Sequence, residues 1–230
     1  MYKARIRLFG ATIETVFPKP IPVGRLDVDK LAEVLLGGLS PIGLTPDQVA
    51  FTKRNDLFDY ELRFPLFRGN ASFSLNSQRL RLDFMNAVGP ADSTAIVDTA
   101  LKCFQPFDLP FGTNHIINVW RQAEFESPSD FEPFFSPQGT QWQGPAITHA
   151  GAILHLRLPG WTEEVTVTID KSVLIQAGVF VNTRTSVKIP ELGDAKPHQF
   201  KTVTADTFGR VTEVFERAVT ECNLELVWAS

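Results

Sequence analysis

Three arginines and two serines form the strongest polar pattern in this sequence. Arg63, Arg79 and Arg81 lie in segments with strand-like alternation, and Ser72 and Ser74 occupy polar positions between them. In an antiparallel sheet such positions fall on one face. An arginine side chain presents a fork of N–H donors that fits a carboxylate or a phosphate. The pattern therefore predicts an anion-binding face; the alternative is an ordinary solvent-facing sheet with its polar residues outward.

The remaining reactive residues form no recognisable catalytic motif. The sequence contains no G-x-S-x-G, H-E-x-x-H, C-x-x-C or phosphate-loop pattern. His149, His155 and His198 would supply zinc ligands only if the fold gathered them, and strand spacing does not place the first two side by side. The sequence thus predicts no catalytic residue, no metal and no cofactor.

Composition and charge restrict the class of protein and its partners. The 230 residues are 43% hydrophobic and 21% charged, values that are typical of soluble globular proteins. Residues 1–114 carry 13 Lys and Arg against 12 Asp and Glu, a net charge of +1. Residues 115–230 carry 9 Lys and Arg against 14 Asp and Glu, a net charge of −5. Neither half has the positive excess of a nucleic-acid binder, so that partner is not expected.

The cysteines and the hydrophobic runs indicate the compartment. Cys103 and Cys222 are the two cysteines and make no disulfide framework. The N-terminal residues lack the apolar run of a signal peptide, and no run approaches 18 uncharged apolar residues. We expect a cytoplasmic protein without a membrane span.

Two stretches that lie 94 positions apart repeat one pattern and organise the chain. Leu62-Arg63-Phe64-Pro65-Leu66-Phe67 matches Leu156-Arg157-Leu158-Pro159-Gly160-Trp161, and the apolar matches continue for about nineteen positions in all. Two stretches that share their apolar pattern and also their proline and aromatic positions are predicted to form one supersecondary unit that the chain uses twice. The alternative is a coincidence of two ordinary hairpins.

The order of expected elements extends the duplication to the whole chain. Each half reads β-α-β-β-β-α, so we predict an α+β fold in which antiparallel sheets pack against helices with pseudo-twofold symmetry. The half-units are residues 1–112 and 113–230. In the first half, we expect strands at 3–17, 57–67, 70–76 and 79–86, with a bulge or bend at Gly10. We also expect a helix at 92–104 and an earlier helix that is capped by Asp27 or Asp29 and ends near Gly37 and Gly38. In the second half, we expect strands at 115–125, 151–158, 164–170 and 173–183 and helices near 128 and at 206–223.

The second half departs from the first at three places. Residues 136–148 and 185–204 read as insertions without strong periodicity. The strand expected at 173–183 is apolar on both faces, with Val173, Ile175, Val179 and Val181 where the repeat predicts a polar outer face. Such a strand is either covered by another element or forms an interface with a partner. A third alternative is a break in the strand register at Gly178.

Aromatic residues gather at the junction between the two halves. Phe and Trp recur through residues 104–142 together with five prolines. A segment of this kind either packs as a seam between the halves or lines an apolar pocket.

A short strand pattern provides one resemblance to a known family. Ile117-Asn118 with Arg121 resembles an Arg-Tyr-Ile-Asn-Arg-type strand found in a sporadically distributed bacterial family of two similar half-units, whose function is unknown. His115-Ile116 replaces Arg-Tyr here and Val119 replaces the next Arg, so the resemblance implies no functional residue. In outline, the duplicated unit is also similar to the saddle of TATA-binding proteins, from which the acidic second half departs.

The function that these observations favour is a non-enzymatic protein-interaction or assembly module, a subunit of a larger complex or a homo-oligomer. Its expected interface residues are Val173, Ile175, Val179 and Val181. The alternative is a small-molecule binding protein or enzyme with a Phe-lined cavity between sheet and helix. No membrane partner is expected.

Overall fold

The computed structural model describes residues 1–25, 27–39, 49–53, 57–86, 93–104, 114–136, 151–157, 163–188 and 196–228. These residues form an α+β fold in which helices pack against antiparallel strands, as predicted from the sequence. The strands are β1 (Tyr2–Val16), β2 (Ala50–Lys53), β3 (Tyr60–Leu66), β4 (Ala71–Asn76), β5 (Arg79–Met85), β6 (Asn114–Phe125), β7 (Ala152–Arg157), β8 (Glu164–Lys171), β9 (Gly178–Lys188) and β10 (Leu224–Val227). The α-helices are α1 (Val28–Leu39), α2 (Ser93–Phe104), α3 (Phe131–Phe135) and α4 (Lys196–Glu221), and short 3-10 helices are η1 (Val23–Arg25), η4 (Phe67–Gly69) and η5 (Pro128–Asp130).

The chain divides into two compact units, and several elements contribute to both. Unit 1 contains residues 1–9, 118–185 and 210–230, and unit 2 contains residues 10–117 and 186–209. The boundary falls within β1, β6, β9 and α4. The expected half-units 1–112 and 113–230 stay a prediction.

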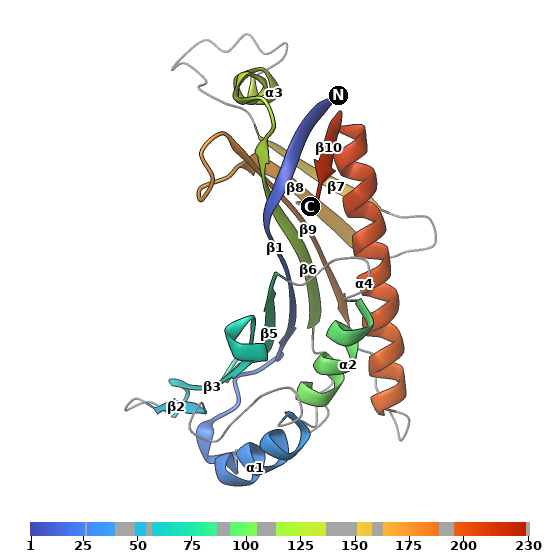
Figure 1. Ribbon diagram of the computed structural model, residues 1–230. Helices are drawn as coiled ribbons and strands as arrows, with labels where there is room; N and C mark the ends of the chain where they lie inside the picture. The colour runs from blue at the N-terminus through green and yellow to red at the C-terminus, as the bar shows by residue number, and fades with distance from the viewer. Residues whose placement is uncertain are drawn as a thin grey trace, which may run out of the picture. The chain divides into compact units, whose positions relative to one another are not determined.

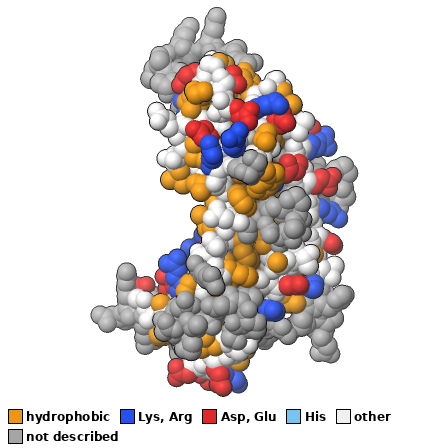
Figure 2. Space-filling view, viewed as in Figure 1, with side chains coloured by type: hydrophobic (Ala, Val, Ile, Leu, Met, Phe, Trp, Pro, Cys, Tyr) orange, Lys and Arg blue, Asp and Glu red, His pale blue; other side chains and the backbone are white. Residues whose placement is uncertain are grey.

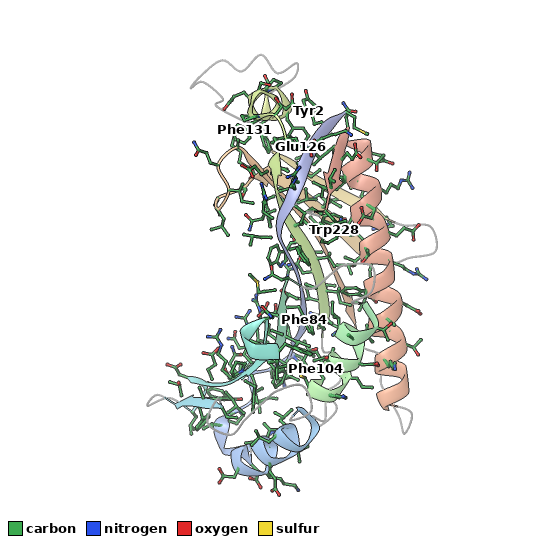
Figure 3. The ribbon with its side chains drawn as sticks, viewed as in Figure 1. Tyr2, Phe84, Phe104, Glu126, Phe131 and Trp228 are labelled. Atoms are coloured by element: carbon green, nitrogen blue, oxygen red, sulfur yellow. The ribbon has the colours of Figure 1, made fainter. Side chains whose placement is uncertain are left out.

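Unit 2 is a sheet with one apolar and one polar face. β2, β3, β4, β5 and the second part of β1 pair as antiparallel neighbours in that order. Alternate residues of β3, β4 and β5 point to the buried face because successive side chains of a strand point to opposite sides. There Phe73 packs against Phe64 and Phe104, with ring centroids 5.8 and 5.9 Å apart. Figure 3 labels Phe84 on β5 and Phe104 on α2 in this side-chain layer.

Unit 1 places the two ends of the described chain side by side. β10 pairs in parallel with the first residues of β1, from Tyr2 opposite Leu224 to Arg5 opposite Val227 (Figure 1). β8 pairs with β7 on one side and β9 on the other. The second part of α4 packs on this sheet through buried Val211, Phe215 and Ala218, which recur at helical spacing.

The strand β1 changes its buried face along its length. Ala4 and Ile6 are buried in its first part, and Ala11, Ile13 and Thr15 are buried in its second part. Gly10 and Thr12 are buried as well, so both faces of the strand are covered at the start of its second part. The bulge or bend expected at Gly10 stays a prediction.

The aromatic residues of the 104–142 segment belong to separate clusters. Phe104 lies in the core of unit 2 beside Phe73. In unit 1, Phe125 packs against Phe131, Phe134 and Phe135, and Tyr2 packs edge-on to Phe134 at 5.3 Å. Figure 3 labels Phe131, on α3, and Tyr2, at the start of β1. Phe107, Phe111 and Trp142 lie outside the described residues.

Three element predictions for the second half are wrong, and the chain adds two short strands. β9 begins at Gly178 and not at residue 173, because residues 172–177 form a tight turn. β9 also continues to Lys188, and α4 begins at Lys196 and not at residue 206, so part of the expected 185–204 insertion is regular structure. β2 and β10 have four residues each, too few for a clear period-two pattern.

Among the described residues, the helices include none whose length and apolar character would let it cross a membrane.

Candidate functional site

The open face of the unit 2 sheet brings together the five polar residues predicted from the sequence. Two rows cross the strands. In one row, Arg63 on β3 pairs with Ser74 on β4, Ser74 with Arg81 on β5, and Arg81 with Glu14 on β1. In the other row, Ser72 lies between Pro65 and Asp83. Arg79 shares the face of Arg81 and completes the set.

Two of the three arginines on this face are neutralised within the sheet. Arg81 donates from Nε and Nη2 to the two oxygens of Asp83 at 2.7 and 2.8 Å, and this hydrogen bonding raises the pKa of Arg81. The Thr12 hydroxyl donates to Asp83 Oδ1 at 2.7 Å. Arg79 Nη1 donates to Glu14 Oε1 at 2.9 Å. The face is therefore a fixed polar network and not a basic patch.

Arg63 differs from the other two arginines. Its side chain is exposed and forms no ion pair or hydrogen bond with the described residues. It lines a pocket of about 430 Å³ together with Ser72, Asp83, Pro65 and Met85. The sequence pattern predicted these polar residues as a surface, whereas the pocket depends on how β2 and η4 border the strands.

The turn at residues 172–177 presents two apolar side chains to solvent. Val173 is 93% exposed and Leu174 is 68% exposed. The turn is held by the Ser172 hydroxyl, which accepts the backbone N–H groups of Leu174 and Ile175 at 3.2 and 3.0 Å. The same hydroxyl donates to Gln122 Oε1, and the Ser172 N–H donates to the Gly178 carbonyl at 2.8 Å. We call residues 172–177 the hairpin tip.

The expectation of a strand over residues 173–181 with two apolar faces is wrong, because residues 172–177 form a turn and β9 begins at Gly178. Val179 and Val181 lie in β9 with no exposed surface, on its buried face, where Val181 pairs with Ile169 of β8. Ile175 is half-buried inside the turn and packs against Gly178. Of the four residues expected at an interface, only Val173 presents most of its surface to solvent, and its neighbour Leu174 joins it.

Gly178 fixes the conformation of the hairpin tip by close approach. A Cβ atom at this position would lie 2.6 Å from Ile175 Cβ and 2.9 Å from the Ile175 carbonyl oxygen. We expect Gly178→Ala to lower the free energy of unfolding by about 1–3 kcal/mol, because the backbone of the turn must move. Urea unfolding measures this change.

Ala177→Gly is the matched control for this prediction. Ala177 has a φ of 51°, a conformation that glycine adopts without strain. Its substitution should leave the stability unchanged or raise it slightly. A Gly178→Ala protein as stable as the wild type would show that the tip is not held by this contact.

The helix-facing side of the sheet contains two buried basic residues. Arg121 on β6, in unit 1, has a side chain that is 5% exposed and donates from Nη2 to Glu216 Oε1 at 2.7 Å. His115, also on β6 but in unit 2, is fully buried; its Nδ1 lies 3.1 Å from the Thr15 hydroxyl and its Nε2 lies 3.2 Å from the Thr204 hydroxyl. Sequence reasoning missed both environments, because their partners lie about 90 to 100 positions away along the chain.

The remaining titratable residues that the structure describes form no metal site. No group of three or more His, Cys, Asp or Glu among them is placed to hold a metal ion. His155 on β7 lies 2.6 Å from Glu164 of β8 at the surface. His149 and the side chain of His198 lie outside the described part.

Comparison with known proteins identifies no relative: no family model matches the chain, and no curated protein matches it significantly. The resemblance through Ile117-Asn118 and Arg121 stays a prediction.

Proposed function

We propose that this chain is a protein-interaction or assembly module that binds a partner through the hairpin tip. The supporting observation is the exposure of Val173 and Leu174 on a turn whose backbone is hydrogen-bonded to Ser172. A backbone that is already held in one conformation loses little conformational entropy on binding, so the apolar side chains that it presents contribute more of their buried area to affinity. Two adjacent apolar side chains supply surface whose burial by a partner is favourable.

The charges around the tip favour a protein partner over a lipid surface. Asp170 lies at the base of the turn, and Asp130 and Glu132 lie on η5 and α3 of the same unit. The Lys171 ammonium group lies over the ring of Phe131, with Nζ 4.7 Å from the ring centroid. Binding to an anionic membrane requires clustered basic residues. Figure 2 shows basic and acidic side chains interspersed on the visible surface around β1 and α3, in accord with ion pairs such as Arg7 with Glu124.

Self-association is the form of this function that can be tested on the isolated protein. We expect the wild-type chain to form a concentration-dependent oligomer in sedimentation velocity experiments. The double variant Val173→Ser, Leu174→Ser should sediment as a monomer while its free energy of unfolding changes by less than about 0.5 kcal/mol, because the substituted side chains are exposed.

Ile153→Ser on β7 is the matched control, since Ile153 is 64% exposed and lies outside the tip. It should leave the sedimentation profile unchanged. If the wild-type chain is monomeric, photocrosslinking from position 174 in native extract should capture one partner reproducibly, and the double variant should lose that partner in a reconstituted binding assay. A monomeric chain that captures nothing specific would refute the proposal.

The internal duplication is part of the same proposal, because a duplicated unit can keep its fold while one copy acquires a contact surface. With the short strands β2 and β10 and the 3-10 helices set aside, it is supported by the element order β1-α1-β3-β4-β5-α2 followed by β6-α3-β7-β8-β9-α4. It is also supported by the pairing order: β5, β4 and β3 follow outward from β1, and β9, β8 and β7 follow outward from β6. In this account, the hairpin tip is where the second copy departs from the first.

A further inference from the structure

We propose that the pocket on the open face of the unit 2 sheet binds a small monocarboxylic acid, with the carboxylate on Arg63 and an apolar body against Pro65 and Met85. This binding site is independent of the hairpin tip, which belongs to unit 1. It differs from the expected Phe-lined cavity between sheet and helix, which stays a prediction, because this pocket lies on the opposite face of the sheet and has no Phe in its lining.

The charge balance of the pocket indicates a single negative charge in the ligand. Arg81 and Asp83 compensate one another through two hydrogen bonds, which leaves Arg63 as the uncompensated cation of the lining. Glu61 lies two positions before Arg63 on the same strand face and forms no ion pair with it. A phosphate dianion would meet one uncompensated arginine and the nearby carboxylate of Glu61, so a monoanion is favoured.

The donors around the pocket match a carboxylate. The Arg63 guanidinium can bind both oxygens of a carboxylate with two parallel N–H donors. The Ser72 hydroxyl is half-buried, makes no hydrogen bond with the described residues and lies in register between Pro65 and Asp83. It can therefore donate to the same carboxylate without giving up an existing partner.

The shape and remaining lining of the pocket indicate the ligand's size and character. The volume of about 430 Å³ lies within the range of small-molecule sites. Ala50, Pro65 and Met85 supply apolar surface, and Met85 is 43% exposed before any ligand binds. Thr12 and Arg81 hold Asp83 from both sides, so the floor of the pocket is fixed in the absence of ligand. When the side chains of a site are already held in place, little binding free energy is lost in ordering them.

Phenylacetate is a suitable probe because it joins one carboxylate to a compact apolar ring. We expect ¹H–¹⁵N NMR titration of the full chain to give a dissociation constant on the order of 1 mM at constant ionic strength. Phenylacetamide, which is neutral and of the same shape, should bind at least roughly tenfold more weakly. Inorganic phosphate at the same concentration should not displace phenylacetate.

Variants of the site and a matched arginine assign the binding to this pocket. Arg63→Gln should weaken phenylacetate binding roughly tenfold or more, because the charge-assisted hydrogen bonds are lost. Arg63→Lys should cause a smaller loss, since it keeps the charge without the fork. Arg157→Gln is the control: Arg157 is the exposed arginine at the equivalent position of the repeated sequence, and its substitution should have no effect.

Several results would overturn the proposal. They are equal binding of phenylacetamide and phenylacetate, unchanged binding by a folded Arg63→Gln protein, displacement by phosphate, or an equal loss in Arg157→Gln. Absence of any chemical-shift change at concentrations about tenfold above the expected dissociation constant would also overturn it. If Arg63→Gln does not fold, Ser72→Ala with Arg63→Lys provides the same comparison.

Discussion

Replacing Arg121 with alanine is expected to lower the free energy of unfolding by about 3–5 kcal/mol, the largest effect of any substitution proposed for this chain. The Arg121 side chain is 5% exposed, and its guanidinium carbon lies 4.4 Å from the ring centroid of Phe215 and 5.0 Å from that of Trp228. A desolvated contact of this kind contributes about 2 kcal/mol. The alanine variant also loses the ion pair with Glu216 and leaves a cavity where the aliphatic stem packed.

The geometry around Arg121 explains why a charge is tolerated there. Trp228 follows β10, and its ring packs edge-on against Phe9 at 4.9 Å (Figure 3). The guanidinium therefore lies against two aromatic rings, while Glu216 reaches it from α4 with a carboxylate whose side chain is 55% exposed. The Arg121 Nε–H has no partner among the described residues, so part of the desolvation cost is not recovered.

Two further variants separate charge from packing at Arg121. Glu216→Gln leaves the buried guanidinium without its carboxylate and should lower stability by about 1–3 kcal/mol. Arg121→Met fills most of the same volume without a charge and should cost less than about 1.5 kcal/mol. The expected order of destabilisation is therefore Arg121→Ala, then Glu216→Gln, then Arg121→Met, measured by urea unfolding.

Arg217→Ala is the control on the same helix. Arg217 pairs with Glu221 four residues later, and both side chains are mostly exposed. Its loss should not change the melting temperature measurably. A folded Arg121→Ala protein with wild-type stability would show that the aromatic and ionic contacts of Arg121 make no net contribution to the free energy of unfolding.

Lowering the pH from about 6.5 to about 4 is expected to remove about 3 kcal/mol of stability through His115 alone. Burial disfavours the charged imidazole and lowers the pKa of His115 to about 4 from its usual 6.5. Below pH 6.5, the unfolded chain therefore takes up a proton on His115 that the folded chain does not accept. The contribution is fully present above pH 6.5 and is lost progressively as the pH falls towards the folded pKa.

The contacts of His115 show why the neutral form is retained. Its ring nitrogens lie beside the hydroxyls of Thr15 and Thr204, each able to donate or accept, and Phe104 packs edge-on against the ring at 6.4 Å. A neutral imidazole has one donor and one acceptor nitrogen, which these hydroxyls can satisfy together.

A comparison of two histidine variants isolates this effect from the general titration of carboxylates. His115→Gln keeps a donor and an acceptor but cannot titrate, so its free energy of unfolding should fall less steeply than that of the wild type between pH 6.5 and 4. His155→Gln replaces an exposed histidine that lies beside Glu164, and it controls for the loss of a histidine as such. Parallel pH dependences for wild type and His115→Gln would contradict the assigned cause.

Local alternation in the sequence was sufficient to predict most strands and the polar face of unit 2. The residues of β3, β4 and β5 alternate between apolar and polar except at Pro65 and Met85, so the grouping of Arg63, Ser72 and Ser74 on one face follows from strand geometry. The same rule failed at residues 173–177. Val173, Ile175 and Ala177 alternate like a strand, but the Ser172 hydroxyl and the absence of a Cβ at Gly178 permit a tight turn whose hydrogen bonds replace the strand ladder.

By itself, the sequence determined the α+β class, the alternating faces and the candidate arginines, because these depend on periods of two and 3.6 along the chain. Only the tertiary structure decided which of those arginines stays available to a ligand. Arg79 is paired by Glu14, 65 positions away, whereas Arg63 has Ser74 and Ala50 opposite it and keeps its charge exposed. Electrostatic energy depends on distance in space, and the identity of the neighbouring strand is fixed only when the sheet assembles.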